Sequence, residues 1–553
     1  MSQSASQEQF DYVIVGGGAA GCILADRLTA SGRHTVLLLE AGEEGRHPWI
    51  SIPAGFSKLM TNKTFNWGFE TEPEANTLSR RIAVPRGKGL GGSTLINGMI
   101  YVRGIQQDYD GWAARGAQGW SYADVEPYFR KLENWVGPEQ APGRSARGKA
   151  GPMHVCEVFE RFPIAEAYLE AATQAGVPRN PDYNAGEQHG VGYYQVLQKG
   201  GRRWSVVDGY LRPARRRPNL KVRGGAHVLR VNLEGRRCTG VTYRNADGSE
   251  RKVHARAEVI LAAGAIQTPQ LLELSGIGRP EVLQAAGIPV VHAMPGVGEN
   301  YIDHYCTRMN WRVRNTLTLN ELSRGVGLFK AVAQYGLTRR GILSLGTGLA
   351  FGFVKSRPEL DLADVQLFFV HASYANAADR RLDREPGMTI GVAQLRPKSQ
   401  GGIHIRSNDP DTAPCIRPNF LAEQEDRDSL VGGMKMARKI VEQPALGHYV
   451  AHEMSPGDRV QTDSDWLEFA RQNGQTIYHP IGTCRMGEDD AAVVDASLRV
   501  RGMEGLRIVD ASVMPTMVSG NTQAAVMMVA ERGADLILRT RRGHTSAVEV
   551  TQR

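Results

Sequence analysis

The hydrophobic pattern at the start of the chain is a short apolar run that leads directly into a cluster of glycines. Residues 10–15 read Phe-Asp-Tyr-Val-Ile-Val, and residues 16–21 read Gly-Gly-Gly-Ala-Ala-Gly. A second apolar run over 35–39 ends on Glu40. A strand, a glycine turn that opens a helix, a second strand and an acid, in this order, predict a dinucleotide-binding unit.

Four residues of this unit carry its binding chemistry. Gly16 permits the tight turn, Gly18 lets a pyrophosphate approach the backbone, and Gly21 lets the helix pack on the strand. The start of the helix presents free N–H groups and a positive dipole end to the phosphates. Glu40 is placed to accept hydrogen bonds from a ribose diol. NAD and FAD share this adenosine end, so the unit alone leaves the choice between them open.

Apolar runs further along the chain have the strand and helix patterns that are typical of a nucleotide-binding domain. Residues 228–233 alternate with period two, and the turn at 245–248 suits a hairpin. Residues 257–264 form a continuous apolar run that ends at glycine, which is typical of a buried parallel strand. Near the C-terminus, residues 506–509 predict a strand and residues 521–538 an apolar helix. Such pieces at both ends and in the middle predict a discontinuous domain.

The remaining segments have weaker patterns. Residues 46–85 carry proline and aromatic residues with little periodicity, which predicts extended segments and turns. Residues 121–135 predict an amphipathic helix capped by Ser121, and the Gly/Pro/Arg-rich residues 137–152 predict an exposed linker. Residues 306–475 mix helical and strand patterns without a glycine fingerprint, so we expect an inserted substrate domain there.

The composition is that of a globular protein with more than one core. The chain has 553 residues, of which 41% are hydrophobic and 22% charged. Its net charge is +8, but no nucleic-acid motif surrounds the arginine clusters, so we expect no nucleic-acid partner. A peripheral contact with anionic lipid is compatible with this charge. No apolar run approaches the ~20 residues that cross a bilayer.

The cysteine and N-terminal patterns favour a cytosolic protein. The six cysteines lie far apart without CxxC spacing, which is typical of reduced thiols. The first residues lack the basic start and apolar stretch of a signal peptide. No histidine has ligand-like spacing with Cys484, so we expect no metal site. We therefore expect a cytoplasmic location, with peripheral contact at the inner membrane as an option.

A set of longer motifs adds a family resemblance. Besides the N-terminal fingerprint, the set comprises the glycine block 87–97, the segment 264–278, and the C-terminal pair 479–487 and 509–515. Residues 296–304 fit as well. With these motifs the chain resembles the glucose–methanol–choline (GMC) family of flavoprotein oxidoreductases, and within it the choline-dehydrogenase-like and bacterial alcohol-dehydrogenase branch.

The resemblance implies a fold and its boundaries. It implies an α/β, Rossmann-like FAD-binding domain with an inserted α+β substrate-binding domain of mixed sheet and helices. The expected FAD-binding domain covers residues 8–158, 200–305 and 479–540. The substrate-binding domain would cover 159–199 and 306–478, followed by a basic tail over 541–553.

The resemblance also implies FAD and the residues that hold it. Ile96 stands where family members with covalent flavin have histidine, and isoleucine cannot form that bond, so we expect noncovalent FAD. The implied cofactor-binding residues surround the ADP half, the flavin and pyrophosphate, the adenine, and the ribityl chain with the pyrimidine edge. They are Gly16, Gly18, Gly21, Glu40, Ala41, Trp67, Gly91, Gly92, Asn97, Gly98, Met99, Ile100, Val228, Gly264, Tyr478, Asp510, Ala511, Asn521, Thr522 and Gln523.

Two residues match the family's active-site positions. His479 is the expected base, because an imidazole titrates near working pH and can take a hydroxyl proton while the carbon gives hydride to flavin N5. Asn521 is expected to donate to the developing alkoxide, and it also suits a helix N-cap. The implied reaction converts an alcohol into an aldehyde. Reoxidation by a quinone, another acceptor or oxygen stays open.

The substrate is less well defined by the sequence. Choline oxidisers carry a glutamate that faces the trimethylammonium group, and an ungapped count puts Arg312 there, which disfavours choline. A neutral, aliphatic or aromatic primary alcohol fits best. Residues 349–353 and 367–370 either line an apolar cavity or form core strands, and the pattern favours core. Two alternatives remain, a redox-neutral flavoprotein of the hydroxynitrile-lyase or photodecarboxylase type, and a non-catalytic flavin-binding protein.

Overall fold

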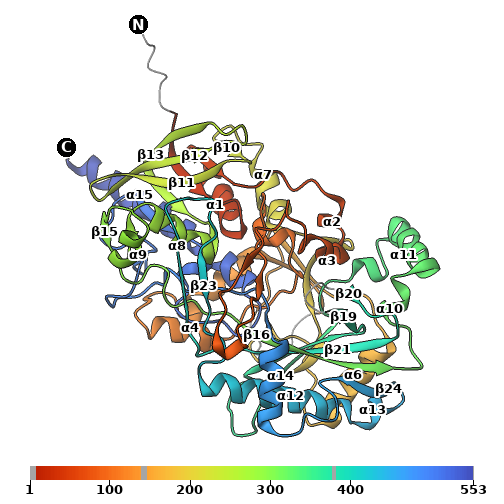
Figure 1. Ribbon diagram of the computed structural model, residues 1–553. Helices are drawn as coiled ribbons and strands as arrows, with labels where there is room; N and C mark the ends of the chain where they lie inside the picture. Colours follow the sequence, from red (N-terminus) through yellow and green to blue (C-terminus); the bar gives the residue numbers. More distant parts are fainter. Residues whose placement is uncertain (1–7, 139–145, 377–380, 552–553) are drawn as a thin grey trace.

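The computed structural model describes residues 8–138, 146–376 and 381–551, and two large sheets organise them (Figure 1). The first sheet has the order β10-β2-β1-β13-β12-β11, with β26 beside β13. Strands β10, β2, β1, β13 and β26 run parallel, whereas β11, β12 and β13 form an antiparallel meander. The strands are β1 (Gln9–Val15), β2 (Val36–Leu39), β10 (Leu220–Arg223), β11 (His227–Glu234), β12 (Arg237–Arg244), β13 (Glu250–Leu261) and β26 (Leu506–Ile508).

This sheet explains the early sequence patterns. The continuous apolar run becomes the C-terminal part of β13, which pairs in parallel with β1, and the turn at 245–248 joins β12 to β13 as a hairpin. Helix α1 (Ala19–Thr29) begins at the glycine turn. Helix α15 (Gln523–Thr551) packs on α1, and Arg27 Nε donates to Glu531 Oε2 at 2.8 Å. The apolar helix expected over 521–538 thus starts at Gln523 and runs on to Thr551.

The second sheet has the order β24-β16-β21-β18-β17-β7, with β25 beside β16. Its pairs are all antiparallel. Helices α6 (Pro163–Gln174), α12 (Gln424–Val441), α13 (Pro444–Gly447) and α14 (Asp463–Asn473) pack against it. The strands are β7 (Gly190–Tyr193), β16 (Tyr305–Val313), β17 (Ala350–Val354), β18 (Val365–Val370), β21 (Gly387–Gln394), β24 (Val450–Ser455) and β25 (Gln475–Thr476). The fold is therefore the expected Rossmann-like domain combined with a second domain of mixed sheet and helices.

Further short elements lie outside these two sheets. A four-stranded sheet has the order β5-β6-β8-β9, and three further helices are α4 (Gln106–Ala113), α8 (Gly264–Leu274) and α9 (Pro280–Ala285). The short strands are β3 (Phe69–Glu70), β4 (Ala83–Val84), β5 (Glu133–Val136), β6 (Met153–Glu157), β8 (Gln195–Lys199), β9 (Arg202–Arg203), β14 (Ile277–Gly278), β15 (His292–Ala293), β19 (Tyr374–Asn376), β20 (Arg381–Leu382), β22 (Gly402–His404) and β23 (Cys415–Arg417).

The expectation of only extended segments and turns over 46–85 is wrong at its start. Three short helical turns follow one another there, α2 (Pro48–Ser51), η1 (Pro53–Gly55) and α3 (Phe56–Leu59). Pro48 and Pro53 each stand in the first turn of their element, where the missing N–H costs nothing and the fixed φ suits a helix. These prolines begin helices instead of preventing them.

Helix α5 (Tyr122–Leu132) begins as expected but ends earlier than 135. Ser121 and Asp124 form a capping box at its start, with Asp124 Oδ2 accepting from Ser121 N at 3.1 Å. The helix ends at Leu132 because Glu133–Val136 pairs with β6 as strand β5. Tertiary pairing here overrides local helical periodicity.

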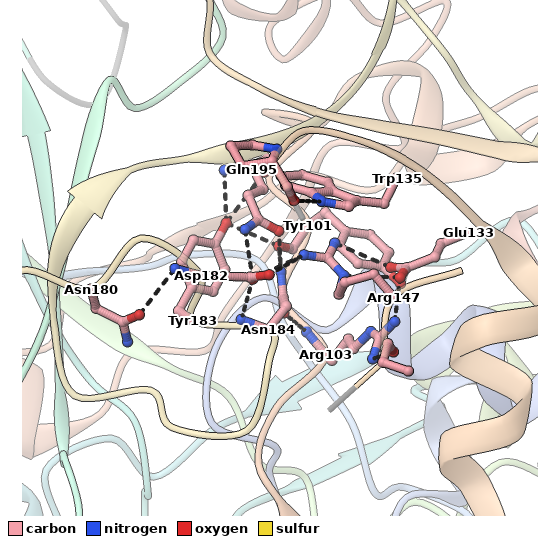
Figure 2. A network of polar contacts seen from close by, with 12 residues as sticks. Tyr101, Arg103, Glu133, Trp135, Arg147, Asn180, Asp182, Tyr183, Asn184 and Gln195 are labelled. Carbon is pink, nitrogen blue, oxygen red and sulfur yellow. Dashed lines mark hydrogen bonds and ion pairs between the residues drawn. The ribbon is translucent and has the colours of Figure 1, made fainter. Parts of the chain in front are cut away.

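The exposed linker expected over 137–152 is wrong at Arg147 and Gly148, which are buried, whereas the other described residues of this segment are exposed or half-buried and residues 139–145 lie outside the described residues. Arg147 is only 6% exposed and takes part in a buried network with Arg103, Glu133 and Asp182 (Figure 2). Arg147 Nε donates to Glu133 Oε1 at 2.9 Å, and its Nη1 donates to Asp182 Oδ1 at 2.9 Å. Arg103 donates to Glu133 as well. Although burial acts to raise the pKa of Glu133, the two arginines hold it below its usual value.

Candidate active site

A long cavity extends from the carboxyl ends of β1 and β2 to the sheet that contains β16, β18 and β21. At one end it is lined by Val15, Gly18 and Leu39, and at the other by His479 and Phe368. Open α/β sheets bind nucleotides outside the carboxyl ends of their parallel strands. The cavity therefore reaches from the expected nucleotide position to a second, inner end beside the antiparallel sheet that can hold a substrate.

The nucleotide end suits a pyrophosphate. Gly18 is the N-cap of α1, and no side chain caps this helix end or puts an acid in its first turn. A Cβ at Gly18 would meet no atom within 4 Å, so the backbone opens onto the cavity that Ala19 and Ala20 also line. Unpaired N–H groups at a helix start attract phosphate, so this cradle fits the FAD that the sequence predicts.

Glu40 has a further role that sequence reasoning missed. Its carboxylate accepts hydrogen bonds from Gly17 N at 2.8 Å, Gly42 N at 2.9 Å and Gly89 N at 3.0 Å. Burial raises its pKa, while these three donors act to lower it. Glu40 therefore ties the fingerprint turn to the second glycine block and fixes one wall of the nucleotide end.

Most of the expected cofactor-binding residues line the cavity. Gly21 and Gly91 do not. A Cβ at Gly21 would lie 1.9 Å from Gly16 O, and Gly91 N donates to Gly17 O at 2.7 Å, so both shape the loops behind the wall. The lining members are Gly16, Gly18, Glu40, Ala41, Trp67, Gly92, Asn97, Gly98, Met99, Ile100, Val228, Gly264, Tyr478, Asp510, Ala511, Asn521, Thr522 and Gln523.

The two expected active-site residues lie side by side at the inner end of the cavity. His479 follows β25 and is 8% exposed, and Asn521 precedes α15. Asn521 Nδ2 lies 3.2 Å from His479 Nε2. The other ring nitrogen of His479, Nδ1, lies 2.9 Å from Nδ1 of His304. His304 is fully buried, and its Nε2 lies 3.1 Å from Leu395 O.

This chain of contacts assigns the protons on both imidazoles. A carbonyl oxygen only accepts, so His304 Nε2 carries a proton and donates to Leu395 O. In a neutral His304, Nδ1 is then an acceptor, and His479 Nδ1–H donates to it. The lone pair of His479 is thereby left on Nε2, which faces Asn521 and the cavity.

The amide of Asn521 gives the same assignment from the other side. Gln366 Nε2 donates to Asn521 Oδ1 at 3.3 Å, which turns Nδ2 of Asn521 toward His479. An N–H group at this position requires an acceptor, so Nε2 of His479 carries the lone pair. The orientation of the Asn521 amide therefore agrees with the tautomer assigned from His304 and Leu395 O.

Burial keeps His479 neutral. Burial lowers its pKa well below the usual value, with smaller contributions from His304 and Arg86, and burial also lowers the pKa of His304 to about 4. Asp303 contacts the backbone instead of the ring, since His479 N donates to Asp303 Oδ1 at 2.8 Å. Burial raises the pKa of Asp303 to about 6. The site thus holds an uncharged imidazole in a fixed orientation.

The substrate end of the cavity combines apolar side chains with the positive charge of Arg308. Phe368 and Val370 of β18 line it, whereas Phe351 and Phe353 of β17 are buried in the core, so the two segments left open by the sequence have different roles. Arg308 of β16 also lines the cavity, and its Nη1 donates to Gln475 Oε1 at 2.7 Å.

The expectation that Arg312 faces the substrate is wrong. Arg312 is outside the cavity lining, and its Nη2 donates to Asp383 Oδ2 at 2.8 Å. Arg308 lies four residues earlier on the same strand, and residues an even number apart on a strand share a face. Both arginines therefore lie on the same face of β16, and only Arg308 lines the cavity.

Comparisons with known proteins agree with this architecture. Two sequence profiles described as GMC oxidoreductase match the chain over residues 10–306 and 397–530. The chain is 39% identical to an alcohol dehydrogenase (acceptor) of Pseudomonas putida, over 96% of each sequence. It is also 39% identical to an oxygen-dependent choline dehydrogenase of Photobacterium profundum, over 96% of this chain and 93% of the relative.

Solved structures with similar folds include two oxidases. A pyridoxine 4-oxidase from Mesorbium loti superimposes with a TM-score of 0.85 at 29% identity, over 95% of this chain and 98% of that one. A formate oxidase gives a TM-score of 0.91 at 27% identity, over 98% and 100%. Of the two dinucleotides that the fingerprint leaves open, FAD is the one that this fold binds. The chain belongs to the GMC oxidoreductase family and is an FAD enzyme that acts on CH–OH donors.

Proposed function

We propose that the protein oxidises a neutral, aliphatic or aromatic primary alcohol to the aldehyde, with His479 as the base. The observation that carries this proposal is the lone pair of His479 Nε2, fixed toward the cavity by His304 on one side and Asn521 on the other. A neutral imidazole in this orientation can accept a hydroxyl proton. Neither alternative, a lyase or a pure binding protein, has a comparable observation in its favour.

The cofactor is proposed to be bound without a covalent link. Ile96 lines the cavity at the position where a covalent attachment would need a histidine, and its side chain offers no nucleophile. FAD bound here supplies the two-electron acceptor for the alcohol carbon. Asn97 is held for contact with it, because Arg203 Nη1 donates to Asn97 Oδ1 at 2.8 Å and Gln523 accepts from Asn97 Nδ2.

The residues at the inner end of the cavity have separate roles in the proposed reaction. When an alcohol enters, its hydroxyl takes the place of the Asn521 amide at His479 Nε2, and the amide N–H turns to the alcohol oxygen. His479 then takes the proton, and the His479 Nδ1–H bond to His304 strengthens as the ring becomes cationic. Asn521 donates to the oxygen as negative charge develops there.

Arg308 argues for a substrate without positive charge. A guanidinium stays protonated in proteins, and the Arg308 side chain donates a hydrogen bond to the neutral amide of Gln475. A trimethylammonium group in the same cavity would be repelled, while the Phe368 and Val370 side chains favour apolar substituents. Of the two curated relatives, the alcohol dehydrogenase therefore provides the better guide to substrate.

The test is anaerobic reduction of the purified yellow protein by a panel of alcohols. Bleaching of flavin absorbance by primary alcohols, with choline at least tenfold less effective, is the expected result. If no alcohol bleaches the flavin, the proposed activity is wrong. Admitting oxygen and then a quinone to the reduced protein identifies the acceptor. A cytoplasmic location with peripheral contact at the inner membrane completes the proposal.

A further inference from the structure

The helix α11 (Gly325–Thr338) is apolar on nearly all sides yet lies on the surface. Only Ala331 and Tyr335 of this helix are buried. Val326 is 70% exposed, Phe329 76% and Leu337 87%. A helix that is apolar all round is normally buried in a core or in lipid. The exposure of α11 therefore implies that something outside the described chain covers it.

The position of α11 sets it apart from both large sheets. It follows the short helix α10 (Leu319–Leu322) and projects at the edge of the molecule (Figure 1). Its anchoring contact is the Tyr335 hydroxyl, which donates to Gly201 O at 3.0 Å. Exposed Leu317, at 62%, extends the same apolar region before α10. The anchored side is narrow, so most of the helix circumference is free for a partner.

Basic side chains border this apolar surface. Residues 324–340 contain Arg324, Lys330, Arg339 and Arg340 and no acidic residue, and all four basic side chains are exposed. Arg340 also lies over the ring of Phe159 at 4.6 Å, and Phe159 is 45% exposed. Large apolar residues bordered by lysine and arginine are typical of helices that lie in the interface of an anionic membrane.

We propose that α11 docks the protein on an anionic lipid bilayer, with Val326, Phe329, Val332 and Leu337 inserted among the headgroups. With 14 residues, α11 is roughly 21 Å long and cannot cross a hydrocarbon core of ~30 Å. In the part of the chain that the structure describes, no helix has the length and apolar character to cross a membrane. The bound helix therefore lies parallel to the membrane plane.

A second copy of the chain is a poorer occupant of this surface. Two copies meeting through α11 would bring two sets of four cations together, and like charges at an interface oppose association. An anionic bilayer instead complements those cations while accepting the apolar side chains. The charge pattern thus selects lipid over self-association.

Docking through α11 would bring the membrane close to the active-site cavity. The chain continues from α11 through η5 (Ile342–Ser344) to Thr347, which lines the cavity. The η5 turn also contacts η1, next to Phe56 and Met60, which line the cavity as well. Apolar alcohols and lipid-soluble quinones concentrate in membranes. This inference therefore deepens the proposed peripheral association and gives it a location on the fold.

The experiment is flotation of the FAD-loaded full-length protein with vesicles. The wild type is expected to float with vesicles of 70% phosphatidylcholine and 30% phosphatidylglycerol, and much less with pure phosphatidylcholine. The triple variant Val326→Ser/Phe329→Ser/Leu337→Ser should stay unbound. The variant Lys330→Gln/Arg339→Gln/Arg340→Gln should bind these vesicles about 100-fold more weakly, because each removed cation lowers the affinity about fivefold. Flotation measures membrane binding without any turnover. A failure of the membrane proposal can therefore be told apart from a failure of the proposed alcohol oxidation.

The matched control is Val290→Ser/Val291→Ser. These valines are 39% and 44% exposed and lie next to β15, at the other edge of the molecule (Figure 1). The control should bind vesicles like the wild type, and all variants should retain flavin and melting temperature. Absence of wild-type binding to anionic vesicles, or unchanged binding of the α11 triple variant, would overturn the proposal. So would a wild-type dimer that the triple variant converts to monomer without any vesicle binding, because α11 would then be an interface between copies.

Discussion

Replacement of His304 tests the proposed orientation of the base without touching the base itself. In His304→Leu the His479 Nδ1–H loses its acceptor, which lies at 2.9 Å in the wild type. The buried N–H would then be unpaired, at a cost of about 1–3 kcal/mol. The ring escapes this cost by moving its proton to Nε2, and the lone pair that should accept the hydroxyl proton is lost.

The size of the effect follows from that cost. If the productive tautomer becomes about 1–3 kcal/mol less favourable, the rate of flavin reduction by alcohol should fall roughly 5- to 150-fold. His304→Gln provides a partial rescue, because an amide can offer an oxygen to His479 and an N–H to Leu395 O. We expect its rate to lie between those of the wild type and His304→Leu.

The assay is anaerobic stopped-flow reduction of the flavin, with flavin content and thermal unfolding measured on the same samples. His371→Leu is the matched control, since His371 is 1% exposed and, among the described residues, neither of its ring nitrogens has a hydrogen-bond partner. It should reduce at the wild-type rate. Wild-type reduction by fully loaded His304→Leu would refute the role assigned to the His304–His479 contact.

Four further predictions concern the site and the fold. Asn521→Ala should retain flavin and slow its reduction about 100- to 1000-fold in the same stopped-flow assay, the usual loss for one donor to a developing oxyanion. Arg308→Gln should lower the KM for choline roughly 15- to 20-fold in steady-state assays, because a unit charge at an assumed separation of ~10 Å contributes about 1.7 kcal/mol at an effective dielectric of ~20. Glu133→Leu should lower the free energy of unfolding by about 3–5 kcal/mol in urea titrations, because two buried arginines lose their shared partner, and an unchanged midpoint would contradict this. Burial acts to lower the pKa of His404, but Glu273 and Glu299 raise it to about 9. The contribution of His404 to the stability of the fold should therefore be complete below pH 6.5 and lost as the pH rises through about 9. Melting temperatures of the wild type should show this loss, and those of His404→Gln should not.

Local patterns were sufficient for the parts of the fold whose partners are near in sequence. The fingerprint turn, the β12–β13 hairpin and the cap of α5 each depend on residues within a few positions of one another. Family motifs added His479 and Asn521, which lie together in the cavity. Their roles in catalysis stay predictions until the variants are measured.

Contacts between distant segments could not be read from the sequence. His304 and His479 are 175 residues apart, and their contact depends on the pairing of β16 with β25 in a sheet whose register no local pattern specifies. Arg147 illustrates the same limit, because a glycine- and arginine-rich segment is typical of exposed linkers, yet Glu133 and Asp182 make its burial favourable. Charged residues are buried where distant partners neutralise them, and those partners are defined by the tertiary fold.

Among the described residues, an amide and a second imidazole contact the ring of His479 and no carboxylate does, and the electrostatics of the inner cavity explain why. A carboxylate on Nδ1 would stabilise the cationic ring and raise its pKa, so that part of the enzyme would carry an already protonated base. His304 is neutral and fixes the ring without adding charge, while Asp303 orients the backbone of His479 from outside the ring. The low pKa that burial imposes makes the base weaker but keeps it unprotonated at working pH. The proton transfer then depends on Asn521 and the bound cofactor to stabilise charge that develops as the alcohol is oxidised.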